Sequence, residues 1–83
     1  MTNESNEFVS IYPNPVVNEL TIKQSSGSFE SYIVLDLVGK VILEGKITSK
    51  TSTINVQKLV PAQYILRMQT SEGQYKHINF TKD

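Results

Sequence analysis

Hydrophobic residues recur at every second position along this chain, and that period limits the possible folds more than any other feature of the sequence. Apolar and polar side chains alternate through residues 20–23 (Leu-Thr-Ile-Lys), and the same period continues through residues 31–37 and 63–70. Successive side chains of a β-strand point to opposite faces, whereas a surface helix needs a period near 3.6. The chain is therefore expected to be all-β.

The spacing of turn residues divides the chain into about seven short strands. The expected ranges are Phe8 to Tyr12, Glu19 to Gln24, Ser31 to Leu37, Val41 to Ile47, Thr51 to Val56, Gln63 to Thr70 and Gln74 to Thr81. Pro13 and Pro15 have no amide hydrogen, so they end the first strand, which can lie only at a sheet edge. Gly39 and Gly73 occupy positions where tight hairpins require a positive φ. We expect an Ig-like antiparallel β-sandwich.

Length and charge exclude several classes of protein. The chain has 83 residues, with eight Lys and Arg against eight Asp and Glu, and it has no cysteine. This length allows one domain and excludes a multi-domain enzyme. Zero net charge removes the positive field that nucleic-acid binding requires, so no nucleic-acid partner is expected. The sequence contains no run of about 18 apolar residues, so we expect no stable membrane insertion.

The residues available for chemistry are few. His77 is the single histidine, so one chain cannot supply two imidazoles to a metal. It alternates with Tyr75 and Asn79, which places it on the face opposite Ile78 and Phe80, and we expect it to face solvent. Counting alone leaves open a Ser/His/Asp arrangement, but no nucleophile-elbow motif of the G-x-S-x-G type accompanies it. We expect no catalytic residue, no metal and no cofactor.

Asp36 and the tyrosines each allow a structural and a functional interpretation. Asp36 lies three residues before Gly39, where a carboxylate commonly accepts hydrogen bonds from turn amides, and we favour that structural role over recognition. Tyrosines at alternating strand positions are mostly packing residues, although a shared exposed face would make a sugar-binding strip. The tyrosines are Tyr12, Tyr32, Tyr64 and Tyr75.

Four blocks of sequence, in order, resemble one protein family. The first is residues 9–22, which contain Tyr12-Pro13-Asn14-Pro15, and the second is residues 33–41, which contain Asp36 and Gly39-Lys40. The third joins residues 54–59, ending at Leu59, to residues 64–68, beginning at Tyr64. The last runs from Glu72-Gly73-Gln74 to Asp83. Together the blocks resemble the C-terminal sorting domains of the type IX secretion system of Bacteroidetes.

The resemblance implies a division of the chain and a set of partners. Residues 8–83 would be the sorting domain, and residues 1–7 a linker that holds the cleavage region, namely Thr2, Asn3, Glu4, Ser5, Asn6 and Glu7. The domain would follow a cargo protein, and it would be read by the type IX translocon and an outer-membrane shuttle protein. A sortase-like signal peptidase would then remove it. The expected location is the periplasm in transit, followed by the cell surface or the medium.

We expect recognition to use the last strand and two glycine turns. The proposed residues are Gly39, Lys40, Gly73, Lys76, Ile78, Phe80 and Lys82. An edge strand can dock by strand addition or by inserting its C-terminus into a receptor. Alternatively, Ile78 and Phe80 fill the core, and for Gly39 and Lys40 we favour a role in forming the turn over direct recognition. If recognition is direct, removing Phe80 to Asp83 blocks export and leaves the fold largely intact.

Two positions depart from the family pattern, and one other class of function competes. Ala62 stands where the family usually has glycine, so we expect a negative φ there. Lys82 is followed by Asp83, whereas the family commonly ends in basic residues. The competing function is an Ig-like adhesive module that binds carbohydrate or protein, and an exposed tyrosine strip would distinguish it.

Overall fold

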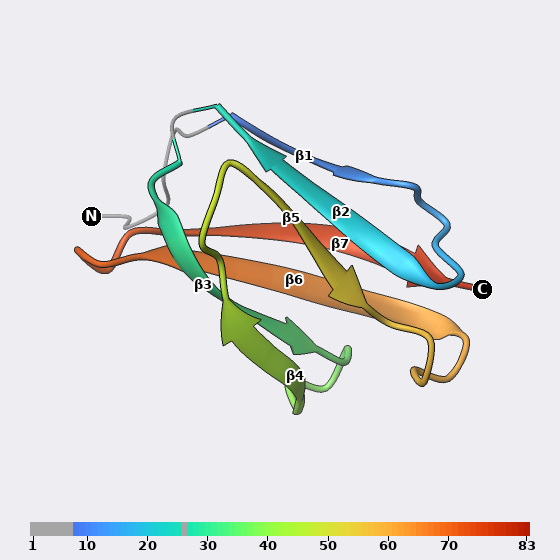
Figure 1. The fold of residues 1–83 in the computed structure, drawn as a ribbon. Helices are drawn as coiled ribbons and strands as arrows, with labels where there is room; N and C mark the ends of the chain where they lie inside the picture. The colour runs from blue at the N-terminus through green and yellow to red at the C-terminus, as the bar shows by residue number, and fades with distance from the viewer. Residues whose placement is uncertain (1–7, 26) are drawn as a thin grey trace.

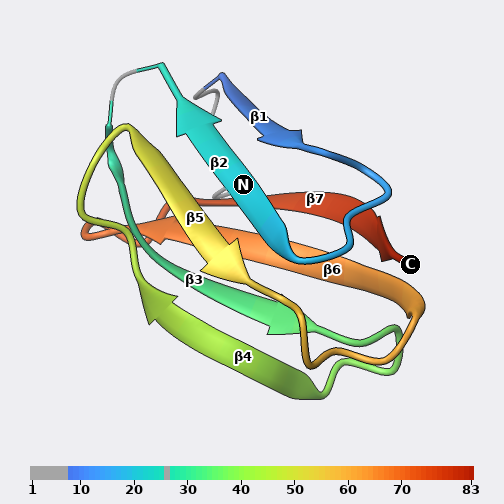
Figure 2. The same cartoon turned by 45° about the vertical axis from the view of Figure 1, so that its right-hand side comes forward.

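The protein is a sandwich of two antiparallel sheets in a computed structural model that describes residues 8–25 and 27–83. The strands are β1 (Val9–Tyr12), β2 (Glu19–Gln24), β3 (Phe29–Leu35), β4 (Val41–Lys46), β5 (Thr51–Asn55), β6 (Ala62–Thr70) and β7 (Tyr75–Lys82). One sheet has three strands in the order β1-β2-β5, and the other has four in the order β4-β3-β6-β7 (Figures 1 and 2). The all-β sandwich is confirmed.

The core lies between the two sheets. Leu20 and Ile22 of β2 and Leu66 and Met68 of β6 are all fully buried and belong to the same core cluster. The polar side chains that alternate with them point outward, which follows from the period of two. A single apolar layer, contributed by both sheets, therefore holds the domain together without any disulfide.

Sequence reasoning placed every strand, with boundaries that differ from the structure by at most two residues. The largest shift is in β3, which begins at Phe29 and ends at Leu35, rather than running from Ser31 to Leu37. A register irregularity between Phe29 and Ser31 interrupts the pairing with β6. Because a bulge inserts one residue into the alternation, the pattern of apolar residues does not mark where this strand begins.

The strand directions give the sandwich two distinct ends. The odd-numbered strands all finish at one end, where the loops 13–18, 36–40 and 56–61 and the C-terminal residue Asp83 lie (Figures 1 and 2). We call this end the motif end, because all four sequence blocks reach it. At the other end lie Phe8, residues 25, 27 and 28, and the loops 47–50 and 71–74. We call it the polar end.

A buried glutamine secures the polar end. The side chain of Gln24 is only 4% exposed. Its Oε1 accepts a hydrogen bond from the amide of Phe29 at 2.9 Å, and its Nε2 donates to the carbonyls of Phe29 and Ser49, both at 3.3 Å. This amide thus links the end of β2 to the start of β3 and to the loop before β5, and its polar atoms are satisfied although it is buried.

Candidate functional site

The Asp36 turn at the motif end is built as the sequence predicted. One carboxylate oxygen of Asp36 accepts hydrogen bonds from the amides of Val38 at 3.0 Å and Lys40 at 2.9 Å. Gly39 has a φ of +90° and donates its amide to the carbonyl of Asp36 at 3.1 Å. The carboxylate is therefore engaged within the turn, and this structural role of Asp36 is confirmed. The side chain of Lys40 is exposed.

The Tyr-Pro-Asn-Pro segment closes the end of the last strand. Val16 forms a parallel bridge with Lys82: its amide donates to the carbonyl of Thr81 at 2.9 Å, and its carbonyl accepts from the amide of Asp83 at 2.9 Å. The side-chain oxygen of Asn14 accepts a third bond, from the amide of Thr81 at 2.9 Å. We call these three bonds the clasp. Pro13 and Pro15 end β1, as expected, and the loop that follows contacts β7 of the other sheet before the chain returns as β2 beside β1.

Leu59 and Tyr64 of the third sequence block belong to the core. Leu59 and Tyr64 are both buried. The Tyr64 hydroxyl donates to the carbonyl of Val60 at 2.7 Å, and its ring stacks on Phe80 with the centroids 5.7 Å apart. Ala62 is the first residue of β6, and no residue other than glycine has a positive φ among those described. The expectation of a negative φ at Ala62 is confirmed.

Exposed apolar side chains gather at the motif end. Among the described residues, six of the seven exposed large hydrophobic residues lie there, and the seventh, Phe8, lies at the polar end. The six are Tyr12, Val17, Leu37, Val38, Val41 and Val60. Each of the three loops at the motif end therefore carries at least one exposed apolar side chain. The loops of the polar end carry serine, threonine, glutamate, glutamine and lysine among their described residues instead.

The proposed recognition side chains of β7 face inward. Ile78 packs against the core, Phe80 is 2% exposed and Lys82 is 7% exposed. The ammonium group of Lys82 donates to the carbonyl of Asp83 at 2.6 Å. Ile78 is partly buried, whereas Phe80 and Lys82 become accessible only if the strand separates from the sandwich, and the clasp opposes separation at its C-terminal end. We expect removal of residues 80–83 to unfold the domain, contrary to the expectation from sequence.

The structure does not gather the proposed recognition residues into one site. Gly39 and Lys40 lie at the motif end, whereas Gly73 lies in the β6–β7 hairpin at the polar end, with a φ of +90°. Lys76 is partly buried near the start of β7. The cleavage residues Thr2, Asn3, Glu4, Ser5, Asn6 and Glu7 lie outside the described residues.

The outward edge of β7 has a stretch of backbone that pairs with nothing described. The amide of Thr70 donates to the carbonyl of Gln74 at the hairpin, so this pair is a hydrogen-bonded one. In an antiparallel pair of strands, hydrogen-bonded and non-hydrogen-bonded positions alternate. Tyr75, His77 and Asn79 are at non-hydrogen-bonded positions, so their amides and carbonyls point away from β6. Among the described residues, only the clasp at Thr81 and Asp83 covers this edge. The strand addition expected from sequence therefore has an open edge available.

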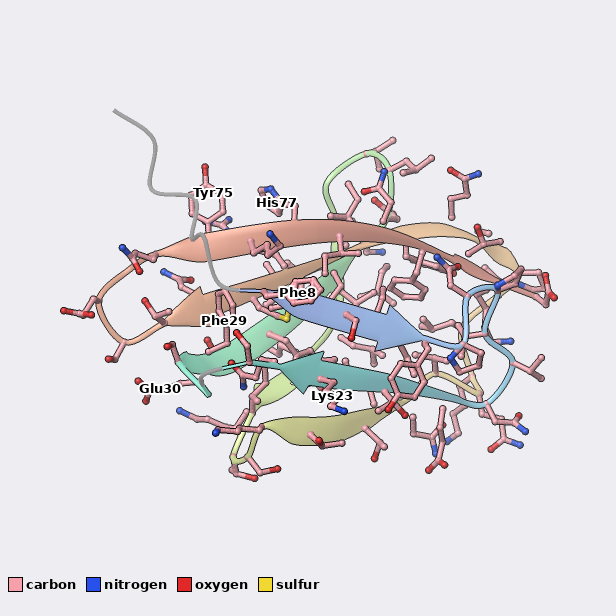
Figure 3. All side chains as sticks on the ribbon, turned by 90° about the horizontal axis from the view of Figure 1, so that it is seen from above. Phe8, Lys23, Phe29, Glu30, Tyr75 and His77 are labelled. Atoms are coloured by element: carbon pink, nitrogen blue, oxygen red, sulfur yellow. The ribbon has the colours of Figure 1, made fainter. Side chains whose placement is uncertain are left out.

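Three side chains beside this edge lie close together, although the sequence analysis did not group them: Arg67, Tyr75 and His77. Tyr75 and His77 lie side by side on the outer face of β7, with their ring centroids 5.0 Å apart (Figure 3). The Arg67 guanidinium lies 4.8 Å from the centre of the Tyr75 ring, and its buried Nε has no hydrogen-bond partner. His77 is exposed, as expected.

The tyrosines do not form a strip. Tyr64 is buried, Tyr32 packs over Gly45 on the inner side of its sheet, and Tyr75 lies on the outer face of β7. Tyr12 alternates with the core-facing Ile11, which places it on the outside of the other sheet. A row of stacked aromatic rings for a sugar is therefore not present on any one face of residues 8–25 and 27–83.

The described part of the chain contains no cluster of three or more His, Cys, Asp or Glu residues that could hold a metal ion. No helix in that part is long and apolar enough to cross a membrane.

Comparison with known proteins identifies the family. The secretion system C-terminal sorting domain family matches residues 10–79. The chain belongs to this family. All four sequence blocks of the sorting domain fall wholly or mostly within the matched residues, and the family implies export by the type IX secretion system. Comparison with curated proteins gave no match.

The fold of the sorting domain is also found in a solved structure. The domain is similar to CopC from Methylosinus trichosporium OB3b, with a TM-score of 0.57 and 18% sequence identity. The similarity covers 92% of this chain and 94% of that chain. At this level of identity it concerns the arrangement of strands alone.

Proposed function

We propose that this domain is the address label of a cargo protein fused to its N-terminal side, and that the type IX translocon and an outer-membrane shuttle protein read it as a folded unit. The observation that carries the proposal is the family match over residues 10–79. The structure adds support, since its described residues offer exposed apolar loops and an open strand edge, both of which are means of binding a protein.

Removal of the domain after export is the second part of the proposal. A sortase-like peptidase at the cell surface would cut within Thr2 to Glu7, which is a polar segment of small and acidic residues before β1. Proteases act on accessible, extended chain, and a polar segment that precedes a packed sandwich fits that requirement. The cargo would then remain outside, secreted or held at the surface.

The test is an export assay with a fluorescent reporter. The reporter carries a periplasmic signal peptide at its N-terminus and residues 1–83 at its C-terminus, and it is expressed in a type IX-competent bacterium and in a translocon-deficient strain. We expect reporter in the medium or at the surface of the competent strain alone. Its mass should show that the domain has been removed between Thr2 and Phe8.

Other outcomes contradict separate parts of the proposal. Reporter retained in the periplasm of both strains would refute the sorting function. Reporter exported at full length would leave the sorting function standing and refute cleavage.

A further inference from the structure

The two ends of the sandwich differ in chemistry, and this asymmetry points to a docking surface. At the motif end, Val38 is 88% exposed, Val60 is 68% exposed and Leu37 is 63% exposed. Leu37 and Val38 are at the tip of the Asp36 turn, and Val60 is in the loop between β5 and β6. Apolar side chains that gather at loop tips, rather than scatter singly, mark sites of protein interaction.

A hollow lies beside one of these loops, residues 56–61. It has a volume of about 290 Å³, and it is lined by Leu43, Asn55, Gln57, Lys58 and Leu59. Binding energy at protein interfaces concentrates where a side chain of one partner enters a pocket of the other. The hollow can accept such an anchoring side chain next to Val60.

The exposed charges within the two loops 36–40 and 56–61 are basic, whereas the exposed carboxylates of the motif end, Glu19 and Asp83, lie outside these loops. Lys40, which follows Gly39, and Lys58, which precedes Leu59, are both exposed. The carboxylate of Asp36 is held by the amides of Val38 and Lys40, so its charge is turned into the loop. The two loops thus combine exposed apolar side chains with two exposed ammonium groups, and this combination complements an apolar depression that also carries carboxylates.

The direction of the chain favours the same end. The cargo of a C-terminal sorting domain precedes β1, and β1 begins at the polar end (Figure 1). The motif end is therefore opposite the end at which β1 begins, and the cargo is joined to the start of β1 through residues 1–7. The polar end has a single exposed large apolar residue among those described, Phe8, which lies next to the cleavage region.

We infer that the loops 36–40 and 56–61 are the surface by which a protein receptor of the export machinery binds this domain. The receptor presents an apolar depression flanked by acidic side chains, and Leu37, Val38 and Val60 enter that depression while Lys40 and Lys58 pair with the carboxylates. This inference rests on the proposed sorting function and names the kind of partner that reads the signal.

The test places charge on the apolar tips of the reporter used above. Val38→Glu and Val60→Glu, combined, put carboxylates where the receptor is apolar and acidic. We expect export to fall at least about tenfold, since one hot-spot contact is worth more than 1 kcal/mol. The matched controls, Phe8→Glu and Ser71→Glu, add the same charge to exposed positions at the polar end and should change export less than about twofold.

A second pair of variants tests the basic rim. Lys40→Glu with Lys58→Glu should reduce export more than Lys40→Ala with Lys58→Ala, because charge reversal adds repulsion to the loss of attraction. Lys23→Glu with Lys50→Glu, which makes the same change of charge on β2 and at the polar end, serves as the control. The urea midpoint of each purified variant domain shows that the fold is retained.

The outcomes are distinguishable. Wild-type reporter that stays inside the competent strain would overturn both the sorting function and this inference. Exported wild type, together with tip variants that are exported equally well, would overturn the inference alone. Equal losses in the tip variants and the polar-end controls would also overturn it, because they would show a general sensitivity to added charge.

Discussion

Substituting Phe80 by alanine is the sharpest test of whether the last strand is read directly or serves the fold. Phe80 is 2% exposed and stacks on Tyr64, whose hydroxyl is in turn bonded to Val60. Removing the Phe80 ring leaves a cavity between the sheets, and the Tyr64 ring loses its packing contact with it. The structure therefore predicts that any loss of export in this variant follows from loss of folding.

The expected loss of unfolding free energy follows from the burial of the Phe80 ring. A Phe-to-Ala change in a core costs about 3 to 5 kcal/mol. A domain of 83 residues has a total unfolding free energy of about 4 to 12 kcal/mol. The substitution therefore removes from about a quarter to all of the stability of the domain. The Phe80→Leu change keeps most of the volume and should cost below about 1.5 kcal/mol.

Urea unfolding of the purified domains, run beside the export assay, separates the two explanations. With a slope of about 1 to 1.5 kcal/mol per molar urea, the midpoint of Phe80→Ala should fall by about 2 to 5 M. Phe80→Leu should remain folded and exported. A Phe80→Ala domain that unfolds near the wild-type midpoint would refute the core role. A Phe80→Leu domain that folds normally but is not exported would show direct recognition of the ring.

Three further predictions concern stability and are checked by the same urea measurement. Gln24→Leu should cost about 1 to 3 kcal/mol, because it leaves the buried backbone groups of Phe29 without partners. Gly45→Ala should cost about 1 to 3 kcal/mol, since the new Cβ would lie 2.6 Å from the Tyr32 hydroxyl, and a Tyr32→Ala background should remove most of that additional cost. Asn14→Ala should cost about 1 kcal/mol by removing one bond of the clasp, and an unchanged midpoint would show that water replaces that bond fully.

The sequence predicted those features that depend on near neighbours along the chain. Leu20 and Ile22 alternate with polar residues, and this alternation predicted both the strand and the face that it buries. The Asp36 turn followed from the spacing of a carboxylate and Gly39, because its donors lie two and four residues away. Such short-range geometry is set by the backbone itself, so it can be worked out before the fold is known.

Features that join distant residues could not be predicted. The amide of Thr81 lies 67 residues beyond Asn14, and Ser49 lies 25 residues beyond Gln24. Their contacts depend on strand order and register, which the pattern of apolar residues does not specify. The apolar tips were missed for a related reason: Leu37 continued the alternation of a strand, so it was counted with β3, whereas the structure places it in a turn.

The clasp also determines how the domain bears mechanical load. Val16 runs parallel to the end of β7, with Asn14 and Val16 holding Thr81 and Asp83 by three bonds of 2.9 Å each. A cargo drawing on the N-terminal side while a receptor holds the C-terminal side would slide these two segments past each other. Bonds that lie across the line of force then share the tension together and do not open one after another, so the domain is built to stay closed while it is pulled.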